Sequence, residues 1–334
     1  MRRNNIDALA NECKINLDKS YIKPEMSISF SVGPKEILIG GRGDLSVVTG
    51  KPKTRKSFLM GLMAASAMTH NHKLASNGQR KALYFDTEQS EYHAAQSLRR
   101  IISVAGKEYL DDISYYALRG CTAESRISII DYIIKKTDDI SLILIDGARD
   151  LVTSINDENQ ATQILDIFSG WTRAKNVHLV TVLHENPSSE KLRGHLGTEL
   201  TNKAENVLAV ELDKNSPGDT SLVYARYTRN TPIPDFSFRI SEFGIPSILD
   251  SVNNNHLQHD SPEILDSLHA VLNDGSGMGH TELLENIKAG LQAKGIQIGN
   301  NKLKEWFMLY QSCGILRKEG KDRSPSAKYF LVQQ

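Results

Sequence analysis

The sequence has few cysteines, no long apolar run and no net charge, and each of these shortages excludes a class of protein. Its three cysteines (Cys13, Cys121 and Cys313) lie far apart and show no C-x-x-C spacing. This argues against a disulfide framework or a zinc site and favours a reducing, cytoplasmic compartment. No uncharged apolar run approaches the ~20 residues that span a bilayer, so we expect no membrane partner. The N-terminal residues include arginines but no apolar core of the kind a signal peptide has.

The charge balance is neutral over the whole chain. The 40 Lys and Arg residues equal the 40 Asp and Glu residues. This excludes a protein that coats nucleic acid by charge neutralisation alone, but it leaves room for a local basic patch. With 334 residues, of which 40% are hydrophobic, the chain can form one large domain or two smaller ones, each with its own core.

Short apolar runs alternate with longer segments of helical spacing between residues 31 and 245. Runs of this length predict strands buried on both faces, and the alternation predicts parallel βαβ units. We therefore expect an α/β fold with a parallel or mixed sheet, flanking helices and a late hairpin. The expected strands are 45–49, 82–85, 142–145, 177–183 and 206–211, the helices are 57–70, 90–105, 123–136 and 160–174, and the hairpin strands are 221–228 and 235–240.

The composition differs on either side of this central region. Residues 1–30 are polar and mixed, which indicates an arm or a first helix with little core of its own. Residues 246–262 include three consecutive asparagines and predict a linker. Residues 263–334 predict a small winged-helix (helix-turn-helix) domain. Its expected helices are 263–272, 281–294 and 301–313, and its expected ribbon strands are 314–318 and 328–332.

The strongest motif is a strand, a loop and a helix between Leu45 and Met60. Backbone N–H groups in such a loop can wrap a phosphate, helped by the N-terminus of the helix. Lys56 would reach the β- and γ-phosphates of ATP, and the Ser57 hydroxyl would bind Mg²⁺. Arg55 stands where the motif has a second glycine, a replacement that a negative φ would tolerate. The alternative is a chance basic turn before a helix. The predicted ATP-binding residues are Gly50, Lys51, Pro52, Lys53, Thr54, Arg55, Lys56 and Ser57.

Two carboxylates follow predicted strands. Asp146 ends the apolar run 142–145, where it would face a ligand crevice and hold Mg²⁺; alternatively, it begins an ordinary turn. Glu88 follows the run 82–85 and could orient the attacking water and accept its proton. Asp86 competes for this role, but it sits nearer the strand body, so Glu88 is preferred.

With this order of motifs, residues 30–245 resemble the RecA-like P-loop ATPases, most closely the RepA-like and DnaB-like hexameric helicases of plasmids and mobile elements. The resemblance implies that a polar residue after strand 177–183 senses the γ-phosphate, and His184 or Asn186 fits. It also implies that the next loop faces a central pore and touches single-stranded DNA through Lys191, Arg193 and His195. The same residues would also fit a solvated surface loop.

The late hairpin carries two arginines, Arg226 and Arg229. In DnaB-like proteins a Lys-x-Arg pair on the corresponding strand reaches the ATP site of the neighbouring subunit. The resemblance therefore implies an arginine acting in trans within a homo-oligomer such as a hexamer. The spacing here is one residue longer, so one arginine alone could serve. A cation on an edge strand with no such partner is the alternative.

The C-terminal segment is basic. From His280 to Gln334 nine cations and five anions give a net charge of +4. Lys302 and Lys304 would begin a recognition helix for the major groove, and Lys321 and Arg323 would lie in the wing. A winged helix that contacts a protein instead is the alternative.

Together these features predict an ATP-hydrolysing, DNA-binding protein: a helicase, or a helicase-like replication initiator of a plasmid or mobile element. One alternative is an accessory protein for transposition, mobilisation or recombination that does not unwind DNA. Another is a nucleotide switch that binds a protein partner. Strand displacement on a forked duplex separates the first prediction from the other two.

Overall fold

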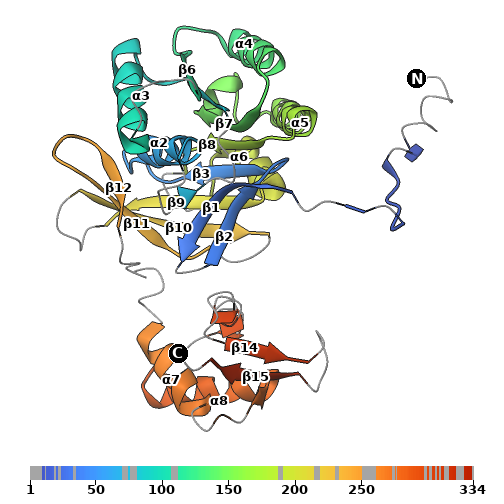
Figure 1. Ribbon diagram of the computed structural model, residues 1–334, viewed down its shortest axis with the longest axis vertical. Helices are drawn as coiled ribbons and strands as arrows, with labels where there is room; N and C mark the ends of the chain where they lie inside the picture. Colours follow the sequence, from blue (N-terminus) through green and yellow to red (C-terminus); the bar gives the residue numbers. More distant parts are fainter. Residues whose placement is uncertain are drawn as a thin grey trace.

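A computed structural model gives the architecture shown in Figure 1. The structure describes residues 10–11, 13–18, 20–21, 24–32, 35–69, 74–75, 81–106, 112–186, 191–213, 219–229, 233–249, 261–272, 275, 277–296, 299–300, 303–304, 307, 310–311, 316–320 and 327–332.

The main body is built on one mixed sheet of nine strands in the order β12-β11-β10-β9-β3-β8-β7-β5-β6. The six strands from β9 to β6 in this order are parallel, and the three beyond β9 are antiparallel. The bounds are β3 Leu45–Thr49, β5 Lys81–Asp86, β6 Ile113–Ala117, β7 Ile140–Asp146, β8 His178–Val182, β9 Asn206–Leu212, β10 Thr220–Thr228, β11 Phe236–Ile240 and β12 Pro246–Ile248.

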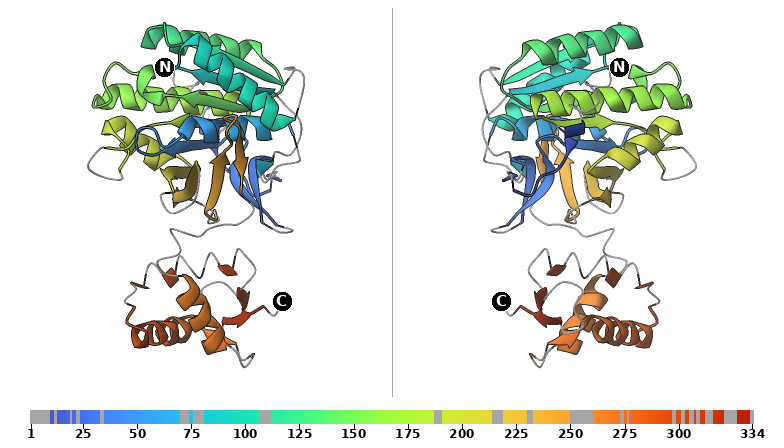
Figure 2. Two further views of the ribbon diagram at one scale, coloured as in Figure 1. Left: turned by 90° about the vertical axis from the view of Figure 1, so that its left-hand side faces the viewer. Right: turned by 90° about the vertical axis from the view of Figure 1, so that its right-hand side faces the viewer.

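Helices cover both faces of this sheet (Figure 2). Alternate residues of the central strands enter opposite cores: Val48 packs with helices α2 and α3, whereas its neighbour Val47 packs with α4, α5 and α6. The prediction of strands buried on both faces is confirmed, since every residue of β3, β7 and β8 is buried. The helices are α2 Lys56–Ser66, α3 Glu91–Ala105, α4 Ala123–Lys136, α5 Glu158–Lys175 and α6 Gly194–Lys203, with a 3₁₀ turn, η1, at Ala148–Leu151.

The predicted N-terminal arm ends earlier than residue 30. Strand β1 (Met26–Val32) pairs with β2 (Lys35–Gly41) and with the short β4 (Leu74–Ala75) in a second sheet. The side chains of Ile28 and Phe30 are buried in the same core as α2. Met26–Val32 alternates serine with apolar residues, a period-two pattern that is typical of a strand and that identifies β1 in retrospect.

The linker and loop predictions also need correction. Pro246–Ile248, the start of the predicted linker, is strand β12 and pairs with β11 in the main sheet. Residues 250–260 lie outside the described residues. At the other end, helix α7 (Ser261–Leu272) begins within the predicted linker. Strand β6 and helix α6 were not predicted at all. His195 therefore lies on a helix and not in the loop where the sequence placed it.

The C-terminal residues form a small unit with its own core. Helix α8 (His280–Ala293) packs against α7, and strands β14 (Leu316–Glu319) and β15 (Lys328–Leu331) form the expected ribbon. A short β13 (Met278–Gly279) adds a third strand beside β15. Most of the predicted helix 301–313 lies outside the described residues, but Leu303, Phe307 and Tyr310 are helical and belong to the core.

Within the described part of the chain, no helix combines the length and the apolar character needed to cross a lipid bilayer.

Candidate nucleotide site

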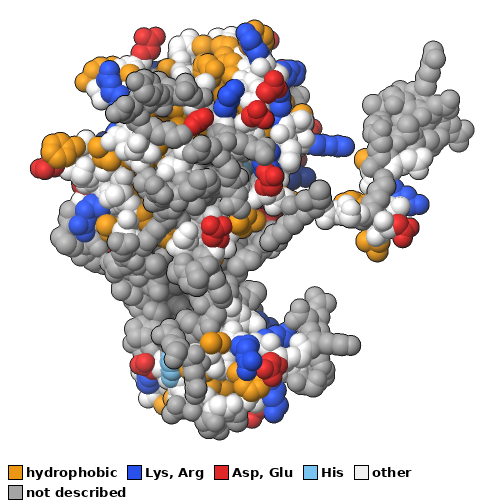
Figure 3. Space-filling model, viewed as in Figure 1, with side chains coloured by type: hydrophobic (Ala, Val, Ile, Leu, Met, Phe, Trp, Pro, Cys, Tyr) orange, Lys and Arg blue, Asp and Glu red, His pale blue; other side chains and the backbone are white. Residues whose placement is uncertain are grey.

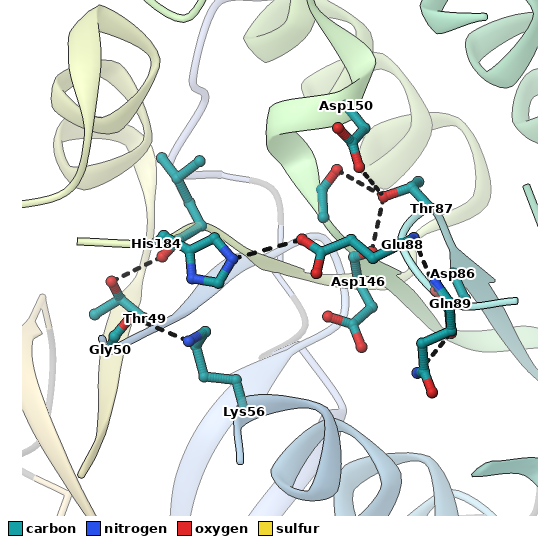
Figure 4. A network of polar contacts seen from close by, with 12 residues as sticks. Thr49, Gly50, Lys56, Asp86, Thr87, Glu88, Gln89, Asp146, Asp150 and His184 are labelled. Atoms are coloured by element: carbon teal, nitrogen blue, oxygen red, sulfur yellow. Dashed lines mark hydrogen bonds and ion pairs between the residues drawn. The ribbon is translucent and has the colours of Figure 1, made fainter. Parts of the chain in front are cut away.

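The C-terminal ends of β3, β5, β7 and β8 meet at one edge of the sheet because these strands are parallel. Ligand sites of open α/β sheets form at this edge. The loop after β3 is the predicted phosphate loop, and the ends of the other three strands supply Glu88, Asp146 and His184. Figure 4 shows Lys56, Glu88, Asp146 and His184 turned toward one another. Lys56, Glu88 and Asp146 were predicted from the sequence, the resemblance implied His184 or Asn186, and the fold brings these four residues to one edge of the sheet.

The phosphate loop has the backbone of an anion cradle. Gly50 has a φ of 146°, and a Cβ there would lie 2.4 Å from the Val210 carbonyl oxygen of β9, so only glycine fits. The Thr54 hydroxyl donates to the carbonyl oxygen of Lys51 (2.9 Å), which folds the loop back on itself. Helix α2 then begins at Lys56 without a side-chain cap. Uncapped N–H groups at a helix start favour a phosphate as their partner.

Lys56 is buried, with 5% of its surface exposed, although it carries a charge. Its ammonium donates to the carbonyl oxygens of Gly50 (3.1 Å) and Lys51 (2.7 Å), so it is held inside the loop. Burial lowers its pKa, while the negative charges of Asp146, Glu88 and Glu185 oppose that shift. A buried cation at this point can bind the phosphates of a nucleotide without first losing a water shell.

The condition under which arginine would easily replace the second glycine, a negative φ at Arg55, is not met. The residue has a φ of 71°, in the left-handed region, and not the negative value that would make arginine an easy replacement for glycine. Its guanidinium points away from the loop interior and binds the start of β10, where it donates to Asp219 Oδ1 at 2.6 Å. The sequence pattern could not identify this contact because 164 positions separate the two residues.

Ser57 and Asp146 are adjacent, as a magnesium site requires. The Ser57 hydroxyl and the Tyr84 hydroxyl both hydrogen-bond to the Asp146 carboxylate, the latter at 2.9 Å. Burial raises the pKa of Asp146 to about 6, and the charge of Asp86 adds to this effect. The described residues contain no group of three or more metal-ligating side chains. Mg²⁺ prefers one or two protein oxygens together with phosphates and water, so this pair fits Mg²⁺ delivered with ATP.

Asp86 and Glu88 have different environments, which separates their roles. The Asp86 carboxylate is fully buried and accepts hydrogen bonds from the Glu88 and Gln89 backbone N–H groups, the Gln89 side chain and the Tyr115 hydroxyl. Such a carboxylate holds the turn and has no face left for water. Glu88 is half exposed at the mouth of the site. The geometry therefore favours Glu88 as the base, as the sequence did.

His184 lies beside Glu88 and not merely on the same edge. Its Nε2 atom is 3.5 Å from Glu88 Oε1. The contact with His184 lowers the pKa of Glu88, with the Lys56 charge adding to the effect, so the carboxylate is ionised and able to accept a proton. The other ring nitrogen, Nδ1, is buried and has no hydrogen-bond partner among the described residues. Asn186, the other predicted sensor, uses its backbone N–H to bond the carbonyl oxygen of Lys191.

The loop after β8 follows directly on His184. An isolated bridge between Glu185 and Leu192 closes its base, and residues 187–190 lie outside the described part. Lys191 and Arg193 are exposed on its returning arm. His195 is exposed too, but on the first turn of α6.

The two arginines of β10 have unequal surroundings. Arg226 is almost fully buried and pairs with Glu185 of the same chain at 2.8 Å, with 7% and 2% of the two side chains exposed. Arg229 is 57% exposed and lies 3.6 Å from Glu205. Strand β10 starts next to the phosphate loop and ends at the opposite edge of the sheet, because Thr228 pairs with Asn206 at the start of β9. Arg229 therefore lies at the edge of the sheet opposite the phosphate loop.

A pocket opens beside Ser57, between α2 and α3. Phe58, Gly61, Ile101 and Pro246 line it, and the Arg100 guanidinium lies 4.5 Å from the centre of the Phe58 ring.

Of the predicted C-terminal DNA contacts, only Lys304 can be located, because Lys302, Lys321 and Arg323 lie outside the described residues. Lys304 is exposed. Burial lowers the pKa of His280 at the start of α8, and the positive charges of Lys304 and of Lys318 on β14 lower it further. The sequence did not single out Lys318. The two lysines come from separate elements and lie near one histidine.

The fold and the site together define a P-loop NTPase domain. Residues 34–190 match the family model described as an AAA domain, a range that contains the phosphate loop, Glu88, Asp146 and His184. No curated protein matches the chain. The family match supports nucleotide binding and ATPase activity for this part of the chain, and the central sheet with its flanking helices fits a RecA-like fold.

Proposed function

We propose that this protein is an ATP-driven DNA-binding protein of the RecA-like type, acting as a helicase or a helicase-like replication initiator. One observation carries the proposal. His184 contacts the base Glu88 at 3.5 Å, and the next residue, Glu185, closes the loop that presents Lys191 and Arg193. A movement of His184 at the γ-phosphate would therefore be passed to its neighbour Glu185 and, through the bridge to Leu192, to the cationic arm of the loop. Cations on such a loop suit the phosphates of a DNA strand.

ATP would bind with its phosphates on the loop Gly50–Ser57. Lys56 would hold the β- and γ-phosphates, and Ser57 and Asp146 would hold Mg²⁺, which supplies positive charge to the phosphates. Glu88 would orient the attacking water and take its proton, and His184 would keep Glu88 ionised. Thus each group has a position that matches its role in phosphoryl transfer to water.

The test is the rate of ATP hydrolysis by the full chain with and without single-stranded DNA, together with strand displacement on a forked duplex. We expect DNA to raise the rate, and Lys191→Ala together with Arg193→Ala to abolish the stimulation but leave the basal rate intact. Stimulation without displacement would instead support an accessory protein for transposition, mobilisation or recombination. A rate that does not respond to any DNA would contradict the proposal and favour a nucleotide switch for a protein partner.

We also propose that the C-terminal residues form a winged helix that contacts duplex DNA. Support comes from the α7–α8 pair, the β14–β15 ribbon and the two lysines, Lys304 and Lys318, near His280. On the face seen in Figure 3, by contrast, basic and acidic side chains are interspersed over the described residues. If the proposal holds, replacing both lysines with alanine weakens duplex binding and lowers its salt dependence. Unchanged binding would point to a protein-binding role.

Assembly into a homo-oligomer such as a hexameric ring follows if Arg229 acts in trans. Arg229 is exposed and lies at the edge of the sheet opposite the phosphate loop, so it cannot serve its own site. Mixing Glu88→Gln subunits with Arg229→Ala subunits should restore turnover, because some interfaces then join an intact Glu88 to an intact Arg229. The measurement is the hydrolysis rate of the mixture against that of each variant alone.

Arg226 provides the control for this experiment. Because Arg226 pairs with Glu185 of its own chain, an Arg226→Ala subunit carries its defect in its own site. A mixture of Glu88→Gln and Arg226→Ala then contains no intact site, and its rate should stay at the level of the separate variants. Recovery with Arg226→Ala but not with Arg229→Ala would transfer the trans role to Arg226. No recovery in either mixture would leave the ring without support.

A further inference from the structure

Arg55 occupies a backbone conformation that its own residue type disfavours. Its φ and ψ of 71° and 30° are left-handed, a region that glycine adopts freely and that a residue with a Cβ occupies at a cost. The position cannot relax without consequence, since Arg55 is the N-cap of α2 and directly precedes Lys56. A shift of this one residue would turn both the Lys56 side chain and the first N–H groups of the helix away from the phosphates.

The side chain of Arg55 has an unusual set of contacts. One end of the guanidinium donates to Asp219 at 2.6 Å, and the other donates to the Thr220 carbonyl oxygen (3.3 Å) and the Ser221 hydroxyl (3.4 Å). Asp219 directly precedes β10, and Thr220 and Ser221 are the first two residues of that strand. Arg55 is 19% exposed in its side chain and Asp219 is 68% exposed, so the ion pair sits at the surface while the other two contacts lie partly beneath it.

We propose that Asp219 is a positioning residue of the phosphate loop, and that it acts only through Arg55 to keep the loop in its phosphate-binding conformation. The inference rests on the proposed ATP site. Asp219 touches no phosphate itself; it fixes the guanidinium of Arg55, which in turn stabilises the left-handed backbone that glycine would adopt unaided. Arginine with its carboxylate partner thus replaces the missing glycine of the loop.

This arrangement also connects the phosphate loop, through β10, to the residue beside the predicted sensor His184. Strand β10 binds Arg55 near its start and, through Arg226, pairs with Glu185 next to His184. A glycine in place of Arg55 would leave the loop without that link. The contact between Arg55 and Asp219 is exposed enough for salt to screen it, so the affinity of the chain for ATP should weaken as ionic strength rises.

The experiment is a double-variant cycle on the full chain, read by calorimetric binding of a non-hydrolysable ATP analogue with Mg²⁺ and by the KM and kcat for ATP. Asp219→Ala should raise the Kd and the KM about three- to tenfold, the range expected for a partly exposed charged contact. The kcat should change less than twofold, because bound nucleotide restores the loop. Asp219→Glu, which keeps the charge, should recover part of the affinity.

The decisive comparison uses Arg55→Gly. Glycine adopts the required φ without a partner, so adding Asp219→Ala to Arg55→Gly should change the Kd for the analogue by less than about twofold. Equal effects of Asp219→Ala in both backgrounds would overturn the proposal, because Asp219 would then act without Arg55. A large loss of binding in Arg55→Gly would overturn it too, because Arg55 would then bind phosphate directly.

The outcome separates this inference from the proposed function. Lys56→Ala is measured in the same series, and loss of analogue binding in that variant shows the phosphate site to be real whatever the cycle gives. If Lys56→Ala binds the analogue normally, the proposed ATP site itself fails.

Discussion

Lys56→Ala should lower ATP turnover by more than about 100-fold, corresponding to a loss of about 3 kcal/mol of transition-state stabilisation. The ammonium is buried in the phosphate loop and is held by two carbonyl oxygens of that loop, so its charge stands where the β- and γ-phosphates would lie. No other lysine can replace it, since the side chains of Lys51 and Lys53 point into solvent as exposed groups. The measurement is steady-state hydrolysis at saturating Mg²⁺ and ATP.

Lys81→Ala serves as the matched control for that result. Lys81 is exposed at the start of β5, at the edge of the sheet away from the site, and its loss removes the same charge. We expect Lys81→Ala to keep turnover within about twofold of the natural sequence while Lys56→Ala loses most of it. That result assigns the effect to the position of the charge and not to the net charge. If Lys56→Ala also stays within about twofold, the phosphate-loop assignment is wrong.

Glu88→Gln should leave ATP binding intact and lower turnover by about 100-fold or more, which is the usual contribution of a general base. Glutamine keeps the size of the side chain and can still contact His184, but it cannot accept a proton from water. The contact with His184 and the nearby charge of Lys56 lower the pKa of Glu88, so the reactive form prevails at neutral pH. Binding of an ATP analogue and the rate of hydrolysis are measured on the same preparation.

Asp86→Asn distinguishes a chemical role from a structural one. Because Asp86 accepts four hydrogen bonds inside the fold, this variant should lower the unfolding free energy by about 1–3 kcal/mol and shift the melting temperature. Glu88→Gln, at a half-exposed position, should melt like the natural sequence. If Asp86→Asn keeps its stability and its ATP binding but loses hydrolysis, while Glu88→Gln remains active, the base is Asp86.

Local sequence pattern was sufficient to predict the central strands and the carboxylates that they position. The run Leu45–Thr49 and its helix are local features, because burial on both faces demands uninterrupted apolar residues and the helix follows directly. Glu88 and Asp146 could be predicted because each comes at the end of a strand of this kind, and parallel strands end at one edge. His184 was implied only by the resemblance to RecA-like ATPases, with Asn186 as the alternative. The same logic separated Asp86 from Glu88 by their distance from the strand body.

The sequence was less informative where a contact joins distant segments or where a strand is half polar. The alternation in Met26–Val32 went unrecognised, and β12 was assigned to a linker because its three residues have no pattern of their own and form a strand only by pairing with β11. The left-handed φ of Arg55 could not be predicted, since residue type alone does not reveal a stabilising carboxylate 164 positions away.

The sequence by itself therefore determined the chemical groups of the site. These are a lysine and a serine at the start of a helix, and two carboxylates at the ends of buried strands. Only the tertiary structure decided which charged side chains form ion pairs with one another and which stay exposed. Arg226 and Arg229 look alike in sequence, yet one is buried on Glu185 and the other is exposed at the far edge. The physical reason is that burial and pairing depend on strand order and register, and these are set by packing of the whole sheet and not by any local run of residues.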